Sequence, residues 1–346
     1  AGDLRPSTDS SDRSILTAVA TAVVDAGLAV KSFGKIPTPA LISYAMSRGW
    51  PSIMVTGSHI PHDRNGIKFY KPAGEIMKSD EAGIKAQSVD LPESKFSSNG
   101  NFLEARALPS IDARPEQLYL DRFLGFFPEQ LLSGLRVGVY QHSSVARDLL
   151  SNVLENLGAE IVNLARSDTF IPVDTEAIRA EDIALAKQWS DEFHFDAIVS
   201  TDGDGDRPLI ADEQGNWLRG DVVGMLCAKY LDAQCVVTPV SSNTVVEKSG
   251  WFESVRRTRI GSPYVIEAME NEKANLTGGV CGYEANGGFL QAGSFNIQGR
   301  ELSALPTRDA FIPILSILAM AKRQNVNLSL IKISYPTILK RKYRIK

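Results

Sequence analysis

Residues 197–207 of the chain read AIVSTDGDGDR. The first four of these residues are apolar or small and predict a short buried strand. Asp202, Asp204 and Asp206 follow directly and are separated by glycines. Because glycine lets the backbone curl without Cβ clashes, three carboxylates at this spacing can converge on one hard cation. In open α/β sheets ligands bind at the carboxyl ends of the strands, so the stretch predicts an α/β fold with a metal site at that edge.

Two other interpretations of this acidic run are less favoured. A solvated acidic turn would leave three repelling charges without a counter-ion. An EF-hand loop would place the three aspartates and Glu213 at loop positions 1, 3, 5 and 12. Its sixth position requires glycine but carries Arg207, and a strand rather than a helix precedes the loop. Arg207 can instead contact phosphoryl oxygens or brace the loop.

Strand-like and helical runs alternate on both sides of this stretch. In the first part of the chain, the pattern predicts a helix that is capped by Ser11 or Asp12 and ends at Gly27, and then a strand over 28–33, a helix over 37–49 and a strand over 52–55. This order implies a parallel or mixed sheet with right-handed crossovers. Residues 79–112 are polar and weakly periodic, which predicts a loop that ends the first unit.

The same alternation continues through the rest of the chain. Helices are expected over 115–127, 143–157, 175–193, 222–231, 244–250, 263–272 and 310–321, strands over 135–140, 161–164, 235–239 and near 257–261 and 279–281, and a hairpin over 209–218. We therefore expect three consecutive α/β units with mixed or parallel sheets, at 1–114, 115–219 and 220–335. Residues 336–346 form a basic tail without a fold prediction.

Composition excludes several classes of protein. The 346 residues carry a formal net charge of −4, which argues against a nucleic-acid partner. No apolar run approaches the ~20 residues of a membrane span, so no membrane partner is expected. The three cysteines, Cys227, Cys235 and Cys281, are distant and odd in number, and form neither a disulfide framework nor a zinc site. The cysteine pattern and the absence of a visible export leader predict a cytoplasmic location. The sequence begins at Ala1 rather than at Met, so we expect it to be a fragment.

A second polar segment follows the strand predicted over 52–55. Residues 56–61 read TGSHIP, in which Ser58 and His59 suit a nucleophile and a proton-transfer partner. The segment is not the elbow of α/β-hydrolases, because residues 56 and 60 are not glycine. An ordinary serine-containing turn remains an alternative. Lys68 can return to the same pocket as a charge or a proton carrier, and a surface lysine is the alternative.

A third polar segment, GYEANGG at residues 282–288, follows another predicted strand. The carboxylate of Glu284 and the amide of Asn286 can pair with sugar hydroxyls. Taken alone, the segment is better explained as a structural turn.

In chain order these segments resemble motifs of the α-D-phosphohexomutase superfamily, in its phosphomannomutase/phosphoglucomutase branch. Residues 56–61 and 65–68 resemble the T-A-S-H-N-P and N-G-x-K parts of the family's phosphoserine loop, residues 202–207 match its D-G-D-G-D-R metal loop, residues 284–287 resemble its G-E-x-S-G sugar loop, and residues 3–7 and 37–39 match framework segments. The resemblance extends over nearly the whole chain.

The resemblance implies an isomerase that interconverts hexose 1-phosphate and hexose 6-phosphate, with mannose or glucose as the hexose. Its implied partners are these substrates and hexose 1,6-bisphosphate, formed as an intermediate through a phosphoserine. The implied catalytic residues are Ser58, His59, Lys68 and Arg207, the implied Mg²⁺ ligands are Ser58, Asp202, Asp204 and Asp206, and the implied substrate ligands are Glu284, Asn286, Gly261, Ser262 and Arg5.

The chain departs from the family pattern at several positions. Gly57 replaces Ala, Ile60 replaces Asn, Asn286 replaces Ser, and Gly288 stands where many relatives have His. The family's first strand and its C-terminal R-x-S-G-T-E-P-like loop are missing, so we expect the fourth domain to be absent and 336–346 to be its start. A Mg²⁺-dependent sugar-phosphate phosphatase and a sugar-phosphate-binding module without turnover remain alternatives. The sequence indicates neither the preferred hexose nor the oligomeric state.

Overall fold

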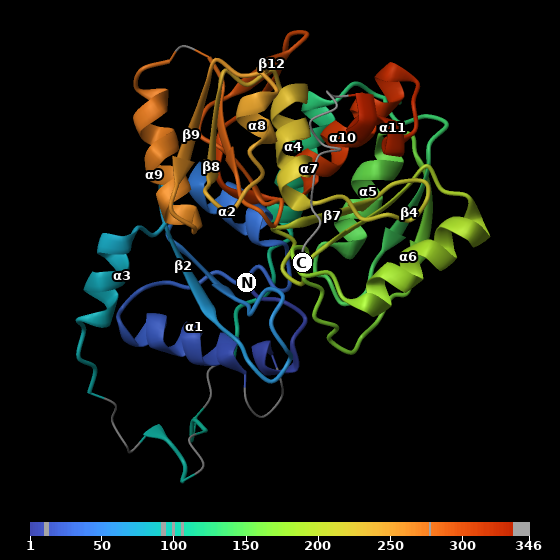
Figure 1. The fold of residues 1–346 in the computed structure, drawn as a ribbon. Coiled ribbons are helices and arrows are strands. Elements are labelled where there is room, and N and C mark those ends of the chain that lie inside the picture. The colour runs from blue at the N-terminus through green and yellow to red at the C-terminus, as the bar shows by residue number, and fades with distance from the viewer. Residues whose placement is uncertain (10–13, 91–94, 99–100, 105–106, 277, 335–346) are drawn as a thin grey trace, which may run out of the picture.

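The computed structural model describes residues 1–9, 14–90, 95–98, 101–104, 107–276 and 278–334. Within these residues the chain forms three α/β units, each with its own sheet, and a separate two-stranded ribbon (Figure 1). The predicted caps Ser11 and Asp12 and the tail 336–346 lie outside the described residues.

The first unit holds an antiparallel sheet in the order β1-β2-β3. Its elements are the 3₁₀ turn η1 (Pro6–Thr8), the helices α1 (Ile15–Asp25), α2 (Thr38–Ser47) and α3 (Lys78–Lys85), and the strands β1 (Ser52–Val55), β2 (Ile67–Lys71) and β3 (Gly74–Glu75). The parallel or mixed pairing expected from the βαβ rhythm is therefore wrong for these strands. Among the described residues of this unit, parallel pairing is limited to single bridges, from Gly2 to Lys35 and to Val55 and from Ser32 to Ile111.

Two local predictions for the first unit are also wrong. Residues 28–33 form no strand, because Ser32 makes only a single bridge to Ile111 and Leu28 is 62% exposed. Within the predicted loop 79–112, helix α3 forms because the Asp80 carboxylate accepts the Met77 N–H at 2.7 Å and caps its first turn.

The second unit has a mixed sheet in the order β5-β4-β6-β7. Strand β4 (Arg136–Tyr140) pairs in parallel with β5 (Glu160–Leu164) and β6 (Ala197–Thr201), while β7 (Pro208–Ala211) is antiparallel to β6. Helices α5 (Arg147–Asn156) and α6 (Ala180–Phe193) accompany them. The helix predicted from residue 175 begins later, because the Asp174 carboxylate accepts the N–H groups of Glu176 and Ala177 and holds a turn there.

The third unit has a five-stranded mixed sheet in the order β14-β11-β10-β8-β9. Its strands are β8 (Cys235–Pro239), β9 (Ser254–Thr258), β10 (Val280–Tyr283), β11 (Phe289–Gln291) and β14 (Leu305–Asp309), beside the ribbon of β12 (Phe295–Ile297) and β13 (Arg300–Leu302). Its helices are α7 (Gly220–Tyr230), α8 (Val245–Lys248), α9 (Ser262–Lys273), α10 (Phe311–Gln324) and α11 (Leu328–Ser334). Strand β8 is parallel to β9 and β10, whereas β11 is antiparallel to β10 and β14.

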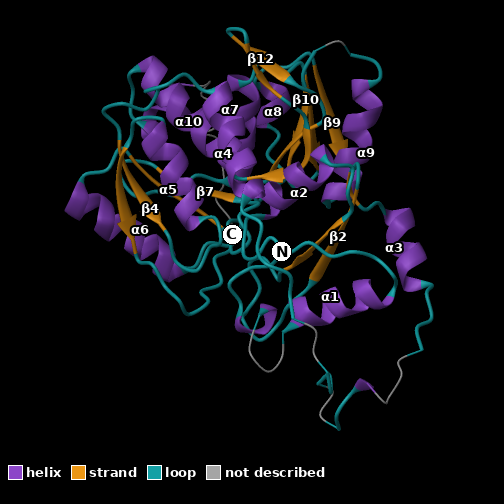
Figure 2. Ribbon diagram, turned by 180° about the vertical axis from the view of Figure 1, so that it is seen from behind, coloured by secondary structure: helices purple, strands orange, loops and turns teal. Residues whose placement is uncertain are grey.

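Three central helices join the units. Figures 1 and 2 show α4 (Arg114–Phe126), α7 and α10 between the sheets of the second and third units. Tyr119 and Phe123 of α4 pack against Phe311 of α10 with their rings tilted, and their ring centroids lie 5.1 and 5.7 Å from its centroid. Burial of each such aromatic side chain contributes roughly 1.5–3 kcal/mol. Residues of all three units share this hydrophobic cluster, which holds them as one body.

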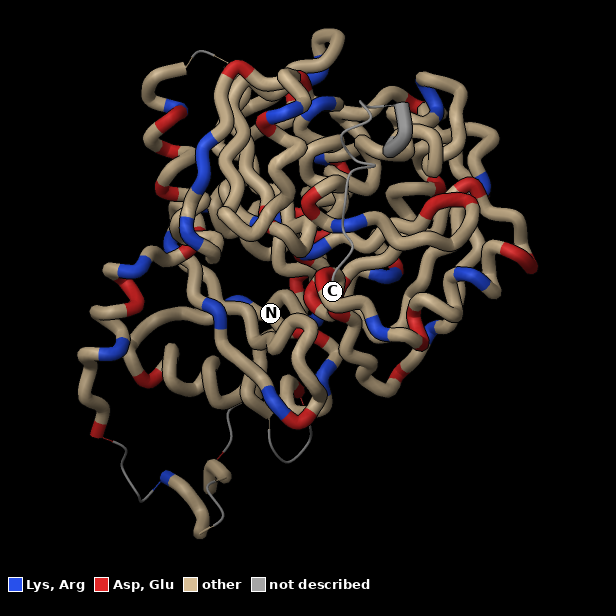
Figure 3. The backbone as a smooth tube through the Cα atoms, in the orientation of Figure 1, with Lys and Arg blue, Asp and Glu red and all other residues tan. Residues whose placement is uncertain are grey.

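Charged residues are spread over the whole molecule, and one group of acidic and basic segments lies near its centre, where the three units face one another (Figure 3). All five residues of β6 are buried, and the strand ends at Thr201, directly before the acidic run. Within the described residues, none of the helices has the length and apolar character needed to cross a bilayer.

Candidate functional site

The segment 56–61 leaves β1 as a tight loop that presents a nearly buried serine. Ser58 has φ of +53°, in the left-handed region that residues other than glycine rarely adopt. The Thr56 hydroxyl accepts the Ser58 N–H at 2.8 Å. The Ser58 carbonyl oxygen accepts a hydrogen bond from Arg5 Nη2 at 2.8 Å. Side chains on both sides of the loop therefore hold this strained conformation.

Arg5 lies beneath this loop and is 1% exposed. Its guanidinium also donates to Asp3 Oδ2 at 2.9 Å, to the Pro61 carbonyl oxygen at 2.6 Å and to the Arg64 carbonyl oxygen at 2.9 Å, and it stacks on the Phe170 ring. These contacts support a role for Arg5 in positioning the loop. Its role as a substrate ligand stays a prediction.

The acidic run forms a compact loop after β6. Asp202 Oδ1 accepts the N–H groups of Asp206 and Arg207 at 3.1 and 3.2 Å. Gly205 has φ of +74°, which lets the chain reverse between the acids. At Gly203 a Cβ atom would lie 2.7 Å from the Ser58 carbonyl oxygen, so only glycine permits this close approach of the two loops.

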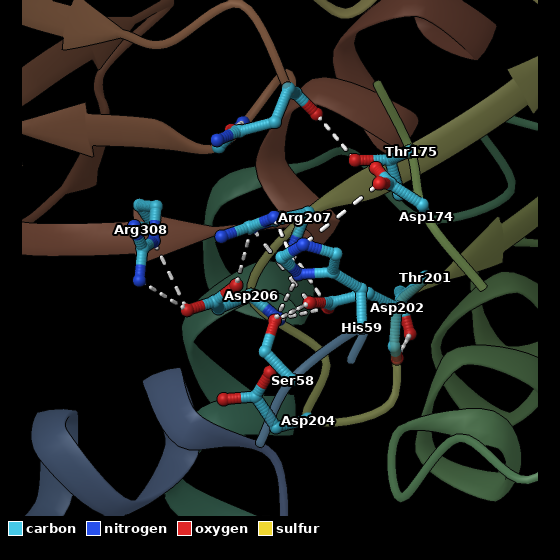
Figure 4. Close-up of polar contacts among 12 residues, drawn as sticks. Ser58, His59, Asp174, Thr175, Thr201, Asp202, Asp204, Asp206, Arg207 and Arg308 are labelled. Carbon is cyan, nitrogen blue, oxygen red and sulfur yellow. Dashed lines mark hydrogen bonds and ion pairs between the residues drawn. The ribbon is translucent and has the colours of Figure 1, made fainter. Parts of the chain in front are cut away.

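The serine and the acids meet across the boundary of the first and second units (Figure 4). Ser58 Oγ donates a hydrogen bond to Asp202 Oδ2 at 2.5 Å. Asp202, Asp204 and Asp206 are buried, and one carboxylate oxygen from each lies within 4.8 Å of the others. The structure therefore brings together the four residues that the resemblance implied as metal ligands.

The acids retain oxygens that fit a metal ion. Asp204 Oδ1 and Asp206 Oδ1 are buried and have no hydrogen-bond partner among the described residues. The other oxygen of Asp204 accepts hydrogen bonds from Thr38 Oγ1 at 2.6 Å and from Lys68 Nζ at 2.7 Å. Buried carboxylate oxygens without partners are costly, and oxygen ligands are those that hard divalent cations prefer. The donor set thus suits a site for a hard divalent cation.

Burial and neighbouring charges shift the pKa values of Asp202 and Asp206 in opposite directions. Burial raises the pKa of Asp202 well above its usual range, and the carboxylates of Asp204 and Asp206 add to the rise. Burial also opposes ionisation of Asp206, but the cations of Arg308 and Lys68 outweigh it and lower the pKa of that carboxyl. Burial lowers the pKa of Lys68 less than the same acids raise it. Lys68 is therefore held as an ammonium ion.

His59 faces the serine from within its own loop. Its Nδ1 lies 3.3 Å from Ser58 Oγ and 2.9 Å from Arg207 Nη1, and its Nε2 lies 3.8 Å from Asp174 Oδ2. Because arginine only donates, Nδ1 accepts from Arg207 and Nε2 carries the hydrogen in the neutral ring. Burial, and then the charge of Arg207, lower the pKa of His59, which favours that neutral form.

The segment 282–288 brings residues of the third unit close to the acidic loop. Arg308 Nη1 donates to Glu284 Oε2 at 3.0 Å, and Arg308 Nε donates to Asp206 Oδ2 at 3.1 Å. Asn286 Oδ1 accepts the Gly288 N–H at 2.9 Å, and the Asn286 carbonyl oxygen accepts from Thr175 Oγ1 at 2.8 Å. Glu284 is thus linked to the acids through one arginine, while the Asn286 side chain braces its own turn.

Gly261 and Ser262 lie at the start of α9, away from these contacts. Ser262 Oγ donates to Glu75 Oε2 of β3 at 2.6 Å. Among the described residues, neither Gly261 nor Ser262 forms a hydrogen bond with the three aspartates. Their role as substrate ligands stays a prediction.

Sequence reasoning missed three residues at this site: Thr38, Asp174 and Arg308. Thr38 was noted only as part of a framework segment. A charged pair, Arg308-Asp309, stands just before the apolar run that forms α10, and this position was the available indication in the sequence. Asp174 carries no comparable indication in its neighbouring residues.

Comparisons with known proteins agree with the fold and with the order of the three units. Models of three parts of one family match, described as phosphoglucomutase/phosphomannomutase, alpha/beta/alpha domain I at residues 3–93, domain II at 117–215 and domain III at 219–336. A solved structure titled as a putative phosphomannomutase from Thermus thermophilus shares the fold, with a TM-score of 0.69 and 20% identity over 88% of this chain and 67% of its own.

Two curated relatives are similar over most of the chain. A phosphomannomutase of Salmonella muenchen is 46% identical over 310 residues, which cover 90% of this chain and 63% of the relative. A phosphomannomutase of Sinorhizobium fredii is 46% identical over 308 residues, covering 89% and 64%. The chain therefore spans just under two thirds of the length of these relatives. The α/β prediction with three consecutive units is confirmed, and the chain belongs to the α-D-phosphohexomutase superfamily, in its phosphoglucomutase/phosphomannomutase family.

Proposed function

We propose that the protein is a phosphohexomutase that interconverts hexose 1-phosphate and hexose 6-phosphate through a phosphoserine at Ser58. The observation that carries the proposal is the 2.5 Å hydrogen bond from Ser58 Oγ to Asp202 Oδ2, beside two further buried carboxylates. A hydroxyl in this position can carry a phosphoryl group within reach of a bound cation. Mannose and glucose phosphates are the proposed substrates, and mannose is supported by the names of the two curated relatives.

Each transfer exchanges one ester bond for another. The bond between phosphorus and Ser58 Oγ breaks, a bond from phosphorus to the oxygen of a sugar hydroxyl forms, and the proton lost by that hydroxyl is balanced by one taken up at Ser58 Oγ. The resulting hexose 1,6-bisphosphate reorients within the site, so that its two phosphate groups exchange places, and it returns its other phosphoryl group to Ser58. A Mg²⁺ ion bound by Asp202, Asp204, Asp206 and the phosphoserine would neutralise charge on the transferred group.

The protein's own groups have distinct roles in this proposal. Neutral His59 has Nδ1 beside Ser58 Oγ and can accept a proton there when it gives up the hydrogen bond from Arg207, whereas Lys68 is held charged by Asp204 and Asp206 and is suited to balance negative charge. Arg207 lies against the serine loop through its contact with His59 and can contact phosphoryl oxygens. Glu284, Asn286, Gly261 and Ser262 are the proposed sugar ligands.

Mass spectrometry tests the proposal directly. Incubation with glucose 1,6-bisphosphate and Mg²⁺ should add one phosphoryl group to the intact protein, and peptide mapping should place it on Ser58. The Ser58→Ala variant is the matched control and should gain none. Net release of inorganic phosphate without isomer exchange would instead indicate a phosphatase, and ligand binding without phosphoryl uptake would indicate a binding module.

A second variant tests the metal ligands. Asp204→Asn removes a carboxylate whose Oδ1 has no hydrogen-bond partner among the described residues. We expect at least about a tenfold loss of Mg²⁺ affinity, since one charged ligand is lost from a buried site. Calorimetric titration with Mg²⁺ measures this loss without relying on turnover. An unchanged affinity would mean that the acids serve the structure only.

A further inference from the structure

Arg308 of β14 bridges two segments to which the proposed function gives different tasks. Its side chain is 14% exposed and contacts Asp206 of the acidic loop and Glu284 of the segment 282–288. Nε and Nη2 lie 3.1 and 3.0 Å from Asp206 Oδ2, and Nη1 lies 3.0 Å from Glu284 Oε2. One guanidinium thus joins an acid of the second unit to an acid of the third. Figure 4 shows the first of these two contacts, between Arg308 and Asp206.

Arg308 contacts only one of the two carboxylate oxygens of Asp206, and the other, which is proposed to face the metal, accepts no hydrogen bond among the described residues. Asp206 Oδ2 also accepts a hydrogen bond from Lys68 Nζ at 3.1 Å, while Asp206 Oδ1 has no hydrogen-bond partner among the described residues. Two cations therefore fix the same oxygen of Asp206. Of these two cations, Arg308 also holds Glu284, and its planar fork fixes the relative orientation of the two carboxylates.

Gly288 provides the space through which Arg308 reaches both acids. A Cβ atom at residue 288 would lie 2.6 Å from Arg308 Cδ and 2.8 Å from Arg308 Cγ. These are atoms in the middle of a buried side chain, so Arg308 would have to move. Gly288 is the position at which the family resemblance led us to expect His. In this chain the arginine methylenes occupy the space beside it.

We propose that Arg308 is a positioning residue that couples the metal site to sugar recognition, by orienting Glu284 toward the sugar while holding Asp206 toward the metal. The coupling rests on the proposed function, because Glu284 is a sugar ligand only if the protein binds hexose phosphates. Gly288 is part of the same arrangement, because the absence of a side chain there leaves space for Arg308.

This geometry predicts opposite changes in two affinities when the charge of Arg308 is removed. Arg308→Gln takes one positive charge from beside Asp206, while Lys68 still holds Asp206 Oδ2, so Mg²⁺ should bind more tightly, by about threefold or more. Glu284 loses its charged partner and its fixed orientation, so hexose phosphate should bind about tenfold more weakly or worse. A purely structural role would lower both affinities together with the melting temperature.

Two further variants separate charge from geometry. Arg308→Lys keeps the charge but has no planar fork to span both acids, so Mg²⁺ affinity should stay near that of the wild type while hexose phosphate affinity still falls. Gly288→Ala keeps every charge and displaces the arginine, so it should show the same pattern as Arg308→Lys. Arg256→Gln is the matched control, because Arg256 pairs with Glu272 on an exposed part of the same unit.

The experiment is calorimetric titration of the whole chain, first with MgCl₂ and then with mannose 1-phosphate in saturating MgCl₂. Tighter Mg²⁺ binding and weaker sugar binding in Arg308→Gln, with the Mg²⁺ affinity restored by Arg308→Lys, support the coupling. If the wild type binds mannose 1-phosphate and Arg308→Gln binds it equally well, the coupling is wrong and the proposed function stands. If the wild type binds Mg²⁺ but no hexose phosphate, the proposed function is wrong and the sugar half of the coupling is wrong with it.

Discussion

Ser58 adopts a backbone conformation that glycine would adopt at lower cost. Its φ of +53° is maintained by the Thr56 hydroxyl on its N–H and by Arg5 on its carbonyl oxygen. For a residue with a Cβ atom this conformation costs of order 1 kcal/mol. The cost is consistent with a functional demand, because the conformation directs Ser58 Oγ toward Asp202.

The strain at Ser58 can be measured by comparing two variants that both lack the hydroxyl. Ser58→Gly should have a higher free energy of unfolding than Ser58→Ala by about 1 kcal/mol, because only the alanine retains the unfavourable Cβ. Denaturant titration of the two variants gives the difference. Equal stabilities would show that the loop relaxes once the hydroxyl is removed and that the serine backbone stores no strain.

Two departures from the family's serine loop are expected to be energetically coupled. A Cβ atom at Gly57 would lie 2.8 Å from Arg5 Cζ and 2.9 Å from Ile60 Cγ1. Gly57→Ala should therefore lower the free energy of unfolding by about 1–3 kcal/mol, as overpacking of a tight site does.

A double-mutant cycle tests this coupling. In the Ile60→Asn background, which brings in the family residue, the cost of Gly57→Ala should be smaller by about 0.5 kcal/mol or more, because asparagine has a single γ atom and can turn it away from residue 57, whereas the β-branched isoleucine cannot do so as freely. Strictly additive free energies in the cycle would contradict the coupling. The remaining cost would be that of the contact with Arg5, which is buried and cannot move away.

The ends of strands β4 and β6 are tied by a buried histidine. His142 lies two residues after the end of β4. The Nε2 atom of His142 lies 2.8 Å from the Thr201 carbonyl oxygen at the end of β6. A carbonyl only accepts, so Nε2 carries the hydrogen. Burial lowers the pKa of His142 to about 4, so the folded protein holds this ring neutral below the pH at which an unfolded chain protonates it.

This difference in pKa makes stability depend on pH. Between the unfolded value of about 6.5 and the folded value of about 4, the unfolded state binds a proton that the folded state does not, so stability falls as the pH drops through this window. From pH 7 to pH 5 the share of His142 in this loss should be on the order of 2 kcal/mol.

The variant His142→Gln isolates that share, because glutamine can donate to the same carbonyl oxygen but does not titrate. The wild type should lose more free energy of unfolding than the variant over this pH range, as measured by denaturant titration at both pH values. Parallel losses in the two proteins would mean that other groups cause the acid sensitivity.

Strands with strong local character could be predicted more accurately than those that depend on distant partners. β1 and β8 have the predicted bounds, because each is a short β-branched or apolar run with turn residues on both sides. Residues 28–33 have similar apolar character, yet the first unit supplies only a single bridge to them. α3 was missed because a side-chain cap rather than apolar periodicity starts it.

The first and third units are joined by a carboxylate that accepts from two hydroxyls. Glu75 of β3 accepts from Thr307 Oγ1 at 2.8 Å and from Ser262 Oγ at 2.6 Å. Thr175 forms a similar tie between the second and third units through the Asn286 carbonyl oxygen. These ties join the units that carry the proposed serine, metal and sugar loops, so they help to set how those loops face one another.

Glu75→Ala should loosen this arrangement without unfolding the chain. Loss of two charge-assisted hydrogen bonds should cost about 2–4 kcal/mol in local stability. Hydrogen exchange followed by mass spectrometry should then show faster exchange in β2 and β3 and unchanged exchange in β4–β6. Glu301→Ala, an exposed glutamate on β13, is the matched control. Exchange that rises equally in all three sheets would argue against a local tie.

The sequence by itself determined the α/β class, the succession of three units and the segments that carry the serine, the acids and Glu284, because these depend on local periodicity and on short motifs. Only the tertiary structure decided that Ser58 touches Asp202, that Arg5 lies beneath the serine loop and that Arg308 joins Asp206 to Glu284. Such contacts join residues far apart in the chain. They depend on the packing of the central helices and on glycines that let loops approach, and neither is visible in a local pattern.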